Sequence, residues 1–462
     1  MFINRVTELE LLEKCFASGK AELFVLYGRR RVGKTELLRR FCEGKRAIFF
    51  VSDLGSEVSL RTAFSSVVNA VLYGPDQMRA IYASWDDLFL ALGRAAQTGR
   101  LVVVLDEFPY LVSAHPPLAS ILQRIWDQNL INSQIMLILC GSYIGMMEET
   151  VLGYQAPLYG RRTGQYLLEP LQFQDARSFF SKYALEDQVR TYAVYGGTPA
   201  YLNTLKSDAS LEQNIQDGIL TRGSFLYDEV RFILQQELRE PRNYFAILQA
   251  VAAGKTRLNE IKQATGIEGA TAYLDTLQNL RLVERRVPVT ETQPHKSRRG
   301  IYRLQDHFLR FWFRYVHPNR SQLERGGAQI ILNDPVLPQL DLFTGLAFED
   351  ICHQFLWSAG LSKQLPFAPL NIGSWWNANE EIDLVVLGET EALLVECKWA
   401  GKPVGGDVLA NLESRAGLIF PELENRRLGF ALCSRSGFTG QVVQEAQARA
   451  DLTLLDLPAI IV

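Results

Sequence analysis

The sequence contains no Cys-x-x-Cys pair, and its six cysteines lie far apart, at positions 15, 42, 140, 352, 397 and 433. This spacing indicates neither a zinc knuckle nor a disulfide framework, and it is typical of a reduced, intracellular protein. No apolar run approaches the roughly 18 residues that a membrane-spanning helix needs, and Met1–Arg5 opens no signal-peptide core. We therefore expect a soluble, cytoplasmic protein without a membrane partner.

An excess of basic charge is also missing. The chain has 48 lysines and arginines against 51 aspartates and glutamates, so its formal net charge is −3. A uniformly basic nucleic-acid-binding protein is excluded, and any contact with nucleic acid has to come from a local patch. Hydrophobic residues make up 47% and charged residues 21% of the chain, which excludes disordered and fibrous classes. The length of 462 residues corresponds to about three domains of roughly 150 residues each.

Short apolar segments alternate with helical patterns over the first part of the chain. The segments that indicate buried strands cover residues 22–28, 47–51, 101–105 and 135–140, and a helix is predicted from about Lys34. Strands that are apolar on both faces and alternate with helices indicate an α/β fold with a parallel sheet covered on both sides. We expect this domain, with a helical lid, to occupy residues 1–205, and a helical connector to follow over 206–240.

From residue 241 the pattern changes. Three short helices and two strands are predicted, over 241–253, 257–265, 269–280, 282–290 and 300–304. Three helices followed by a β-ribbon are typical of a winged helix, which we place at residues 241–305. Prolines and paired glycines indicate a linker over 306–340. Residues 341–462 return to an α/β pattern, with helices near 345–358 and 406–416 and strands near 381–387, 391–399 and 427–433.

The first predicted strand is followed by the phosphate-loop pattern G-x-x-x-x-G-K-[ST]. The loop and the residue after it consist of Gly28, Arg29, Arg30, Arg31, Val32, Gly33, Lys34, Thr35 and Glu36. In such a loop the glycines let backbone N–H groups surround a polyphosphate, Lys34 reaches the β- and γ-phosphates, and the Thr35 hydroxyl binds Mg²⁺. The following helix adds the positive end of its dipole. The pattern therefore predicts a P-loop NTPase fold with ATP and Mg²⁺ as ligands.

The strand over 101–105 ends in Asp106 and Glu107. A carboxylate at this edge of a parallel sheet can complete the Mg²⁺ coordination shell, which is the role predicted for Asp106. Glu107, one residue further on, is placed to orient or deprotonate the attacking water.

Three more residues are candidates for this site. Ser142 follows the strand over 135–140 and is a candidate sensor of the γ-phosphate, although a serine in a turn explains it equally well. Arg161 and Arg162 are candidate arginine fingers, because a guanidinium stabilises charge in the transition state. A solvated or structural arginine is the alternative for each.

Several motifs of residues 2–205 occur in combination. They are Phe2-x-x-Arg5-x-x-Glu8-Leu9, the phosphate loop, Leu105-Asp-Glu-Phe108, Cys140-Gly-Ser-Tyr143 and Gly196-Gly-Thr-Pro199. Together they resemble the archaeal-type ATPases related to the AAA group, among the signal-transducing and origin-recognition-like P-loop ATPases. The resemblance implies that Phe2 and Arg5 lie by the adenine and that Gly196–Pro199 joins the nucleotide core to the next domain. It leaves open whether the protein forms a homo-oligomer.

The predicted winged helix has little positive charge on its third helix. Residues 269–280 contain no lysine or arginine, which is poor equipment for contacting bases or phosphates. The predicted wing, in contrast, carries Arg285-Arg286 and His295-Lys296-Ser297-Arg298-Arg299. A basic wing can lie on a phosphate backbone without reading sequence, and a lid or docking role explains it equally well.

Residues 381–398 predict a β-hairpin with charged residues embedded in apolar strands. With residues 389–390 as the loop, pairing outward puts Asp383 opposite Glu396, at a Cβ–Cβ distance of about 5 Å. Alternation along the strand puts Glu396 and Lys398 on one face and Cys397 on the other. Two such carboxylates repel unless a divalent cation such as Mg²⁺ bridges them or one is protonated. Lys398 can position a water or neutralise charge on a phosphate.

Together with Glu349 in the preceding apolar helix, these residues resemble the PD-(D/E)xK nuclease superfamily. Glu349, Asp383, Glu396 and Lys398 match its acid, acid, acid and lysine positions, whereas an isoleucine precedes Asp383 where a proline is usual. The resemblance implies that Glu349, Asp383 and Glu396 hold a metal and that Asp383, Glu396 and Lys398 act in catalysis. Residues 310–462 also look like a domain often fused to archaeal-type ATPases. A nuclease-like domain without activity is the alternative.

The sequence thus predicts a Mg²⁺-dependent ATPase that is associated with nucleic acid, with DNA favoured over RNA, and that cleaves phosphodiester bonds through its C-terminal domain. The alternative is a nucleotide-controlled switch whose C-terminal domain only binds a partner or nucleic acid. The intact acid–acid–lysine set favours the first function, and the shortage of positive charge on the third helix favours the second.

Overall fold

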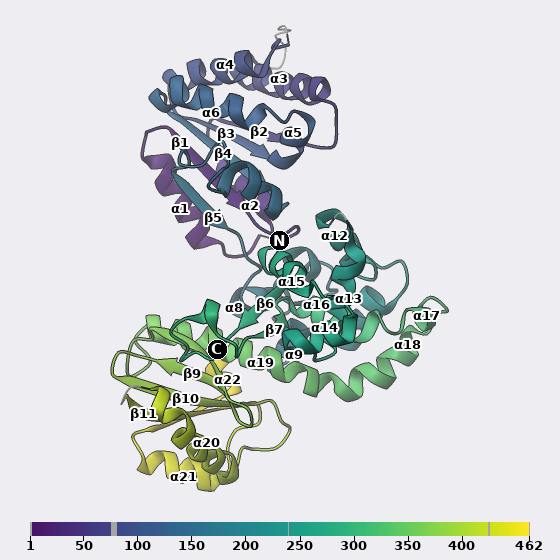
Figure 1. Cartoon of the computed structure of the whole chain (residues 1–462), viewed down its shortest axis with the longest axis vertical. Helices are drawn as coiled ribbons and strands as arrows, with labels where there is room; N and C mark the ends of the chain where they lie inside the picture. Colours follow the sequence, from purple (N-terminus) through teal and green to yellow (C-terminus); the bar gives the residue numbers. More distant parts are fainter. Residues whose placement is uncertain (1, 75–80, 239, 424–425, 462) are drawn as a thin grey trace. The chain divides into compact units, whose positions relative to one another are not determined.

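The protein is described by a computed structural model that covers residues 2–74, 81–238, 240–423 and 426–461. The chain divides into two compact units, Met1–Pro170 (unit 1) and Leu171–Val462 (unit 2), which Figure 1 shows coloured along the sequence. None of the helices in the described ranges combines the length and the apolarity that crossing a bilayer requires.

Unit 1 is built on a five-stranded parallel sheet with the strand order β2-β3-β4-β1-β5. Its helices and strands are α1 (Val6–Ala17), β1 (Glu22–Tyr27), α2 (Lys34–Cys42), β2 (Ala47–Val51), α3 (Glu57–Tyr73), α4 (Trp85–Gln97), β3 (Leu101–Asp106), α5 (Phe108–Ala114), α6 (Leu118–Gln128), β4 (Ile135–Gly141), α7 (Ile144–Met147) and β5 (Gly164–Leu167). The predicted parallel sheet is confirmed, and the four predicted strands are β1 to β4.

The two faces of this sheet bury alternate residues of β1. Leu23 and Val25 belong to the core that includes α3, α4, α5 and α6, whereas Phe24 and Leu26 belong to the core that includes α1 and α2. Because both faces are covered, every residue of β3 and β4 is buried. The polar residues Asp106 and Ser142 therefore lie where β3 and β4 end.

Unit 2 begins with helices, and more helices follow its ribbon. They are α8 (Phe173–Ala176), α9 (Leu185–Tyr195), α10 (Pro199–Leu202), α11 (Leu211–Ile215), α12 (Glu229–Glu237), α16 (His307–Phe311), α17 (Arg320–Leu323), α18 (Ala328–Ile331) and α19 (Leu337–Leu361). The units divide at Pro170, before the boundary expected at residue 205, because α9 packs against α16 and α19. Gly197 lies so close to the backbone of Leu171 that no side chain fits there, since a Cβ would lie 1.8 Å from the Leu171 carbonyl oxygen.

The linker expected over 306–340 is instead a folded part of unit 2. This segment contains α16, α17, α18 and the start of α19, and it buries Phe308, Trp312 and Val316 completely. Its glycines and prolines lie where one short helix gives way to the next, so they mark turns within a packed layer. Buried aromatic side chains, which a solvated linker does not carry, explain the difference.

Between these helices lie three helices and a two-stranded antiparallel ribbon, as predicted. They are α13 (Pro241–Ala252), α14 (Leu258–Thr265), α15 (Ala270–Asn279), β6 (Val283–Arg286) and β7 (Ile301–Leu304). The first ribbon strand ends at Arg286 and not at residue 290. The reason is that the chain leaves the ribbon, and the Val289 N–H donates to the Ser374 carbonyl at 2.9 Å.

The C-terminal part of unit 2 is a mixed five-stranded sheet with the order β12-β11-β10-β9-β8. Its elements are β8 (Asn371–Trp376), β9 (Glu381–Leu387), β10 (Glu391–Lys398), α20 (Gly406–Ile419), β11 (Arg427–Ser434), α21 (Gly440–Ala448), β12 (Leu452–Asp456) and α22 (Leu457–Ile461). The pairs β8–β9 and β9–β10 are antiparallel, whereas the pairs β10–β11 and β11–β12 are parallel. The β9–β10 register is the predicted one, with Leu384 opposite Val395 as the last pair.

Candidate functional site

The phosphate loop of unit 1 connects β1 to α2. Gly28 has a φ of 151°, and a Cβ there would lie 2.3 Å from the Leu168 carbonyl oxygen, so this position requires glycine. Lys34 is only 6% exposed, and its Nζ donates to the carbonyl oxygens of Gly28 and Arg29, at 2.9 Å each. The ammonium group therefore lies inside the loop.

The other predicted residues of the loop differ in their surroundings. Arg30 donates to the Tyr110 hydroxyl of α5 at 2.7 Å, and Arg31 has a φ of 69°. Val32 is buried in the core under α2, whereas Glu36 is exposed in the first turn of that helix. An exposed acid at this position also complements the dipole of the helix.

The ends of β3 and β4 bring further predicted residues together with the loop. The Thr35 hydroxyl donates to Asp106 Oδ2 at 2.6 Å, and Asp106 is buried. Ser142, also buried, donates its hydroxyl to the Glu107 carboxylate, at 2.8 and 2.9 Å from its two oxygens. A hydroxyl and a carboxylate in contact are oxygen donors that suit a Mg²⁺ shell. Ser142 therefore contacts Glu107. Neither of the roles predicted for Ser142, sensor of the γ-phosphate or serine in a turn, included this contact.

Arg5 contacts the same loop from the N-terminal motif. Its guanidinium donates to the carbonyl oxygens of Val32 at 3.1 Å and Glu169 at 2.8 Å, and it pairs with Glu8 at 2.9 Å. Sequence reasoning gave Arg5 a place by the adenine through resemblance only and missed this support of the loop. No spacing rule connects residue 5 to residue 32, so nothing in the pattern signalled the contact.

Arg161 and Arg162 both have partners within unit 1. Arg161 pairs with Asp127 at 3.0 Å, and Arg162 donates to the Leu152 carbonyl at 2.8 Å. These contacts favour the structural alternative over an arginine finger.

In unit 2, the residues predicted for the nuclease-like site gather where β9 begins and β10 ends. Asp383 Oδ2 accepts a hydrogen bond from the Cys397 N–H at 2.8 Å. Lys398 Nζ lies 2.5 Å from Glu396 Oε1, and Arg415 of α20 lies 3.1 Å from Glu396 Oε2. Arg415 was not predicted, because it belongs to the next helix and has no fixed spacing from the hairpin.

The charges in this group perturb one another. Burial and the Glu396 carboxylate raise the pKa of Asp383 to about 7. Burial and the Asp383 carboxylate raise the pKa of Glu349, on α19, to about 8. Burial opposes the charge of Lys398, but its hydrogen bond to Glu396 raises the pKa. Glu349 and Asp383 are thus close enough to interact, and all four predicted residues belong to one electrostatic cluster.

This carboxylate cluster fits a divalent cation in part. Glu349, Asp383 and Glu396 supply the oxygen ligands that Mg²⁺ prefers, and a cation would relieve the repulsion that raises the two pKa values. Both oxygens of Glu396, however, are already paired with Lys398 and Arg415. A metal on Glu396 therefore requires one of these two cations to move.

Comparisons with known proteins bear on both units. Residues 2–205 match a family model described as an ATPase domain predominantly from Archaea. An uncharacterised protein of Methanocaldococcus jannaschii is 35% identical over 404 residues, which cover 86% of this chain and 88% of that protein. The chain belongs to this family of archaeal-type P-loop ATPases. An uncharacterised ATP-binding protein of the same archaeon is 56% identical over 46 residues, or 10% of this ATPase and 78% of the relative.

Two further similarities extend beyond the phosphate loop. Residues 312–409 of the ATPase match a second family model, described as archaeal and bacterial proteins of unknown function. The Walker-type ATPase of Pyrococcus abyssi is a solved structure that is 20% identical, with a TM-score of 0.49, and the match covers 68% of this chain and 96% of that one.

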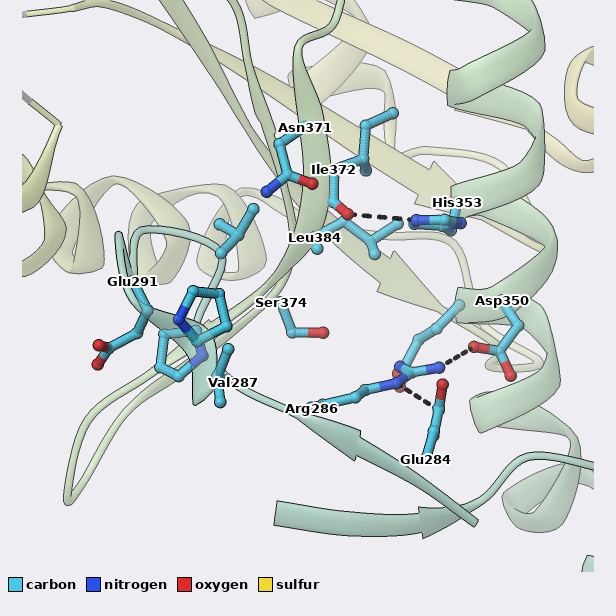
Figure 2. A pocket seen from close by; sticks show the side chains of 15 residues that line it. Glu284, Arg286, Val287, Glu291, Asp350, His353, Asn371, Ile372, Ser374 and Leu384 are labelled. Atoms are coloured by element: carbon cyan, nitrogen blue, oxygen red, sulfur yellow. Dashed lines mark hydrogen bonds and ion pairs between the residues drawn. The ribbon is translucent and has the colours of Figure 1, made fainter. Parts of the chain in front are cut away.

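A pocket of about 260 Å³ lies beside Glu349 in unit 2 of the ATPase (Figure 2). Its walls come from the end of β6 and the segment after it, from α19 and from β8. Arg286 and Asp350 meet at one end, and His353 Nε2 lies 3.3 Å from the Ile372 carbonyl oxygen at the other. The ribbon thus lies directly against the helix that carries Glu349.

Asp350, the residue after Glu349, pairs with cations from two other segments. Arg286 of β6 and Arg310 of α16 approach its two carboxylate oxygens at 3.0 and 2.9 Å. Burial opposes ionisation of Asp350, but these two arginines hold its pKa well below the usual range. Asp350 therefore fastens the ribbon and α16 to α19.

Replacing Asp350 by asparagine should lower the free energy of unfolding by about 3 kcal/mol, because in a largely buried place Arg310 loses its paired carboxylate and Arg286 keeps only Glu284. Its pKa is depressed in the folded state, so its contribution is present above the ordinary pKa of about 4 and is lost as the pH falls toward the folded-state value. Urea unfolding of the wild type and of Asp350→Asn at pH 7 and at about pH 2 measures both effects, because the loss of the contribution lies below the ordinary pKa.

Asp341→Asn is the matched control on the same helix. Asp341 is paired with Arg190 and Arg435, but its side chain is 51% exposed, so the loss should stay below about 1 kcal/mol. Equal losses of unfolding free energy in the two variants would show that Asp350 does not hold the ribbon and α16 to α19.

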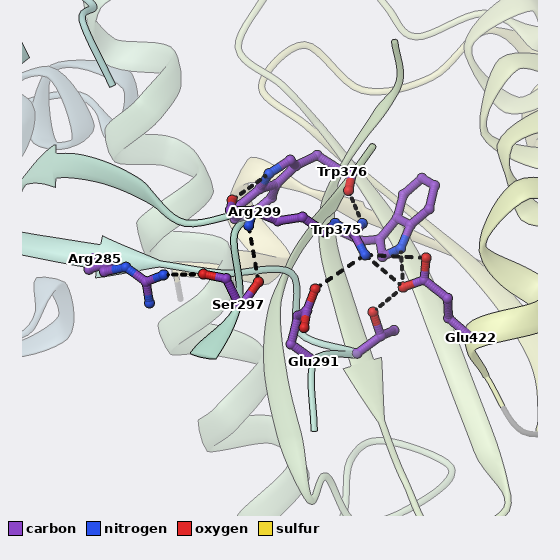
Figure 3. A network of polar contacts seen from close by, with 8 residues as sticks. Arg285, Glu291, Ser297, Arg299, Trp375, Trp376 and Glu422 are labelled. Atoms are coloured by element: carbon purple, nitrogen blue, oxygen red, sulfur yellow. Dashed lines mark hydrogen bonds and ion pairs between the residues drawn. The ribbon is translucent and has the colours of Figure 1, made fainter. Parts of the chain in front are cut away.

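The basic segment between β6 and β7, which the sequence predicts to be a wing, is partly docked within unit 2 (Figure 3). Arg299 pairs with Glu422 at 3.2 Å and donates to the Trp376 carbonyl. The Trp375 indole N–H donates to the same Glu422 at 3.0 Å, and both tryptophans are buried. These contacts favour the docking role for Arg299.

The remaining basic residues of the wing divide between docked and exposed positions. Arg285 of β6 donates to the carbonyl oxygens of Pro294 at 2.9 Å and Ser297 at 2.6 Å, so its contacts lie within the segment from β6 to β7. Lys296 and Arg298 are exposed. The two interpretations of the wing therefore apply to different residues.

If these two exposed residues contact DNA, replacing Lys296 and Arg298 together by alanine should lower the salt dependence of that binding by about two units of slope, because each phosphate contact contributes about 0.9. Arg299→Ala should leave the slope unchanged and lower the melting temperature, since Glu422 loses its cationic partner and the Trp376 carbonyl loses its donor. DNA affinity measured at several salt concentrations separates these outcomes. A slope that falls only in Arg299→Ala would reverse the assignment.

Proposed function

We propose that this ATPase is a DNA-associated enzyme in which Mg²⁺-dependent ATP hydrolysis in unit 1 controls a metal-dependent nuclease site in unit 2. The observation that carries the nuclease half is the meeting of Asp383, Glu396 and Lys398 at the ends of adjacent strands, with Glu349 in electrostatic reach. The order of helix α19, three antiparallel strands, helix α20 and a parallel strand supports a PD-(D/E)xK-like domain.

In the ATP half, each residue has a role that its contacts support. Lys34 exchanges the carbonyl oxygens of its own loop for the β- and γ-phosphates. Thr35 and Asp106 would hold Mg²⁺, which would supply charge neutralisation for the phosphates. Glu107 orients or deprotonates the attacking water, and Ser142 positions Glu107 by donating to its carboxylate.

In the nuclease half, Glu349, Asp383 and Glu396 hold the divalent metal, which supplies Lewis acidity at the phosphate and an activated water. A metal there would displace Lys398 from Glu396, and the freed ammonium would be placed to stabilise the charge that develops on the phosphate. The helices α13 to α15 and the ribbon form a winged helix, and its exposed Lys296 and Arg298 contact the DNA backbone.

A second function, a nucleotide-controlled switch without cleavage, is favoured by one observation. Both oxygens of Glu396 are paired with cations of the same chain, so the cluster is neutralised without a metal. Incubation of the purified ATPase with single- and double-stranded DNA and RNA, in Mg²⁺ or Mn²⁺ and with or without ATP, separates the two functions. Cleavage that requires Asp383 supports the nuclease, and no cleavage in any condition supports the switch.

A further inference from the structure

Three of the six cysteines meet inside unit 2. Cys352 comes from α19, Cys397 from β10 and Cys433 from β11, and their sulfur atoms all lie within 4.8 Å of one another. Cys397 and Cys433 are direct register partners on the two parallel strands. Each of the three side chains is at most 8% exposed. The fold therefore brings together three thiols that are distant in the sequence.

This geometry is close to that of a shared metal ion. Thiolate sulfurs lie about 2.3 Å from a bound ion, so three of them around one ion are separated by about 4 Å. Shifts of less than about 1 Å would bring the three sulfurs to that spacing, within the range of ordinary side-chain adjustment. A buried cysteine often serves only as a small apolar side chain, but that role does not require three sulfurs at one point.

The surroundings restrict the kind of ion. Soft thiolate ligands select soft ions such as Cu(I) and Zn²⁺. A structural zinc ion takes four ligands, whereas this group, among the residues that the structure describes, consists of three thiols without a further histidine or carboxylate. Burial also leaves little access for a water as fourth ligand.

We propose that Cys352, Cys397 and Cys433 form a three-thiolate site for a soft, thiophilic metal ion, with Cu(I) as the ion whose coordination number it suits. Binding replaces the thiol protons by the metal and transfers no electron. The site is distinct from the carboxylate cluster, because alternation along β10 directs Cys397 to the face opposite Glu396 and Lys398. An ion held here would tie α19, β10 and β11 together.

The test uses the full-length ATPase, reduced with a phosphine and kept free of oxygen. Cu(I) is supplied by a coloured chelator of known affinity, and the copper transferred per chain is measured. The wild type should take one Cu(I) with three sulfur neighbours in X-ray absorption. Cys352→Ala, Cys397→Ala and Cys433→Ala should each lower that uptake at least about tenfold, which corresponds to about 1.4 kcal/mol or more in binding free energy.

The chain offers matched controls in unit 1. Cys15→Ala and Cys42→Ala remove partly exposed thiols and should leave the high-affinity uptake unchanged. Copper uptake and DNA cleavage are separate measurements on the same wild-type protein, so failure of the nuclease proposal and failure of the copper proposal can be told apart. Circular dichroism shows whether each variant is folded, and the absorption spectrum of the wild type tests the ligand set without any substitution. Copper uptake that survives Cys352→Ala, or a wild type that binds no Cu(I) with its thiols reduced, overturns the proposal.

Discussion

Lys34→Ala should lower the affinity of the ATPase for ATP by about 100-fold or more, equivalent to about 2.8 kcal/mol. The Lys34 ammonium is buried inside the loop, where it donates to the carbonyl oxygens of Gly28 and Arg29, and the triphosphate would take over these hydrogen bonds. Without the ammonium, no positive charge separates the carbonyl oxygens of the loop from the negatively charged phosphates. Binding of a fluorescent ATP analogue measures the loss.

Two companion variants make this result specific. Lys20→Ala removes an exposed lysine from the same unit and should bind ATP like the wild type. Glu107→Gln should keep ATP affinity but lose turnover, because Thr35 and Asp106 remain while the water loses its base. Equal ATP affinity in the wild type and in Lys34→Ala would remove the loop from nucleotide binding.

Asp383→Asn should abolish DNA cleavage, with a loss of about three orders of magnitude or more if the carboxylate cluster holds the metal. The substitution keeps an oxygen that can accept the hydrogen bond from the Cys397 N–H, so the strand geometry is preserved while the charge is lost. Metal affinity measured by calorimetry should fall with activity. ATP hydrolysis should persist, since Asp383 and the phosphate loop belong to different units. Cleavage that persists in Asp383→Asn would assign the activity to another site or to a contaminant.

Lys398→Ala separates catalysis from metal binding at the same site. It should lower cleavage by about 100-fold, because charge stabilisation is lost, while metal affinity is kept or increased as Glu396 loses one of its paired cations. Lys402→Ala and Glu389→Gln change exposed residues near the same strands and should leave both quantities unaltered. A loss of metal in Lys398→Ala would mean that the lysine supports the ligands.

The phosphate loop and the acidic pair of unit 1 could be predicted from the sequence because short-range rules govern them. A phosphate loop between a strand and a helix, and an acidic pair after an apolar strand, have fixed positions in a parallel sheet, and Lys34, Thr35 and Asp106 do lie together. The β9–β10 register was predictable for a similar reason, since loop length determines it.

The contacts that could not be predicted depend on tertiary packing. Arg415 reaches Glu396 from the next helix, and Asp350 receives arginines from β6 and α16. The prediction of a linker over residues 306–340 was wrong because glycines and prolines occur in turns both in solvated segments and between short packed helices. The cysteines, read by spacing alone, showed no relation to one another, yet a register pairing and a helix bring three of them together.

Helix α19 gives these contacts a common evolutionary consequence. Over six consecutive residues it directs Glu349 to the carboxylate cluster, Asp350 to the ribbon and Cys352 to the sulfur atoms, and the Gln354 side chain accepts from the Phe173 N–H at 2.8 Å. Residues of one helix differ by about 100° and 1.5 Å per step, so any rotation or sliding of α19 changes all four contacts at once. Substitutions at these positions should therefore be epistatic, with double-variant effects that depart from additivity even where the side chains never touch. In related sequences, we therefore expect substitutions in this segment of α19 to occur together with substitutions of the residues that it contacts.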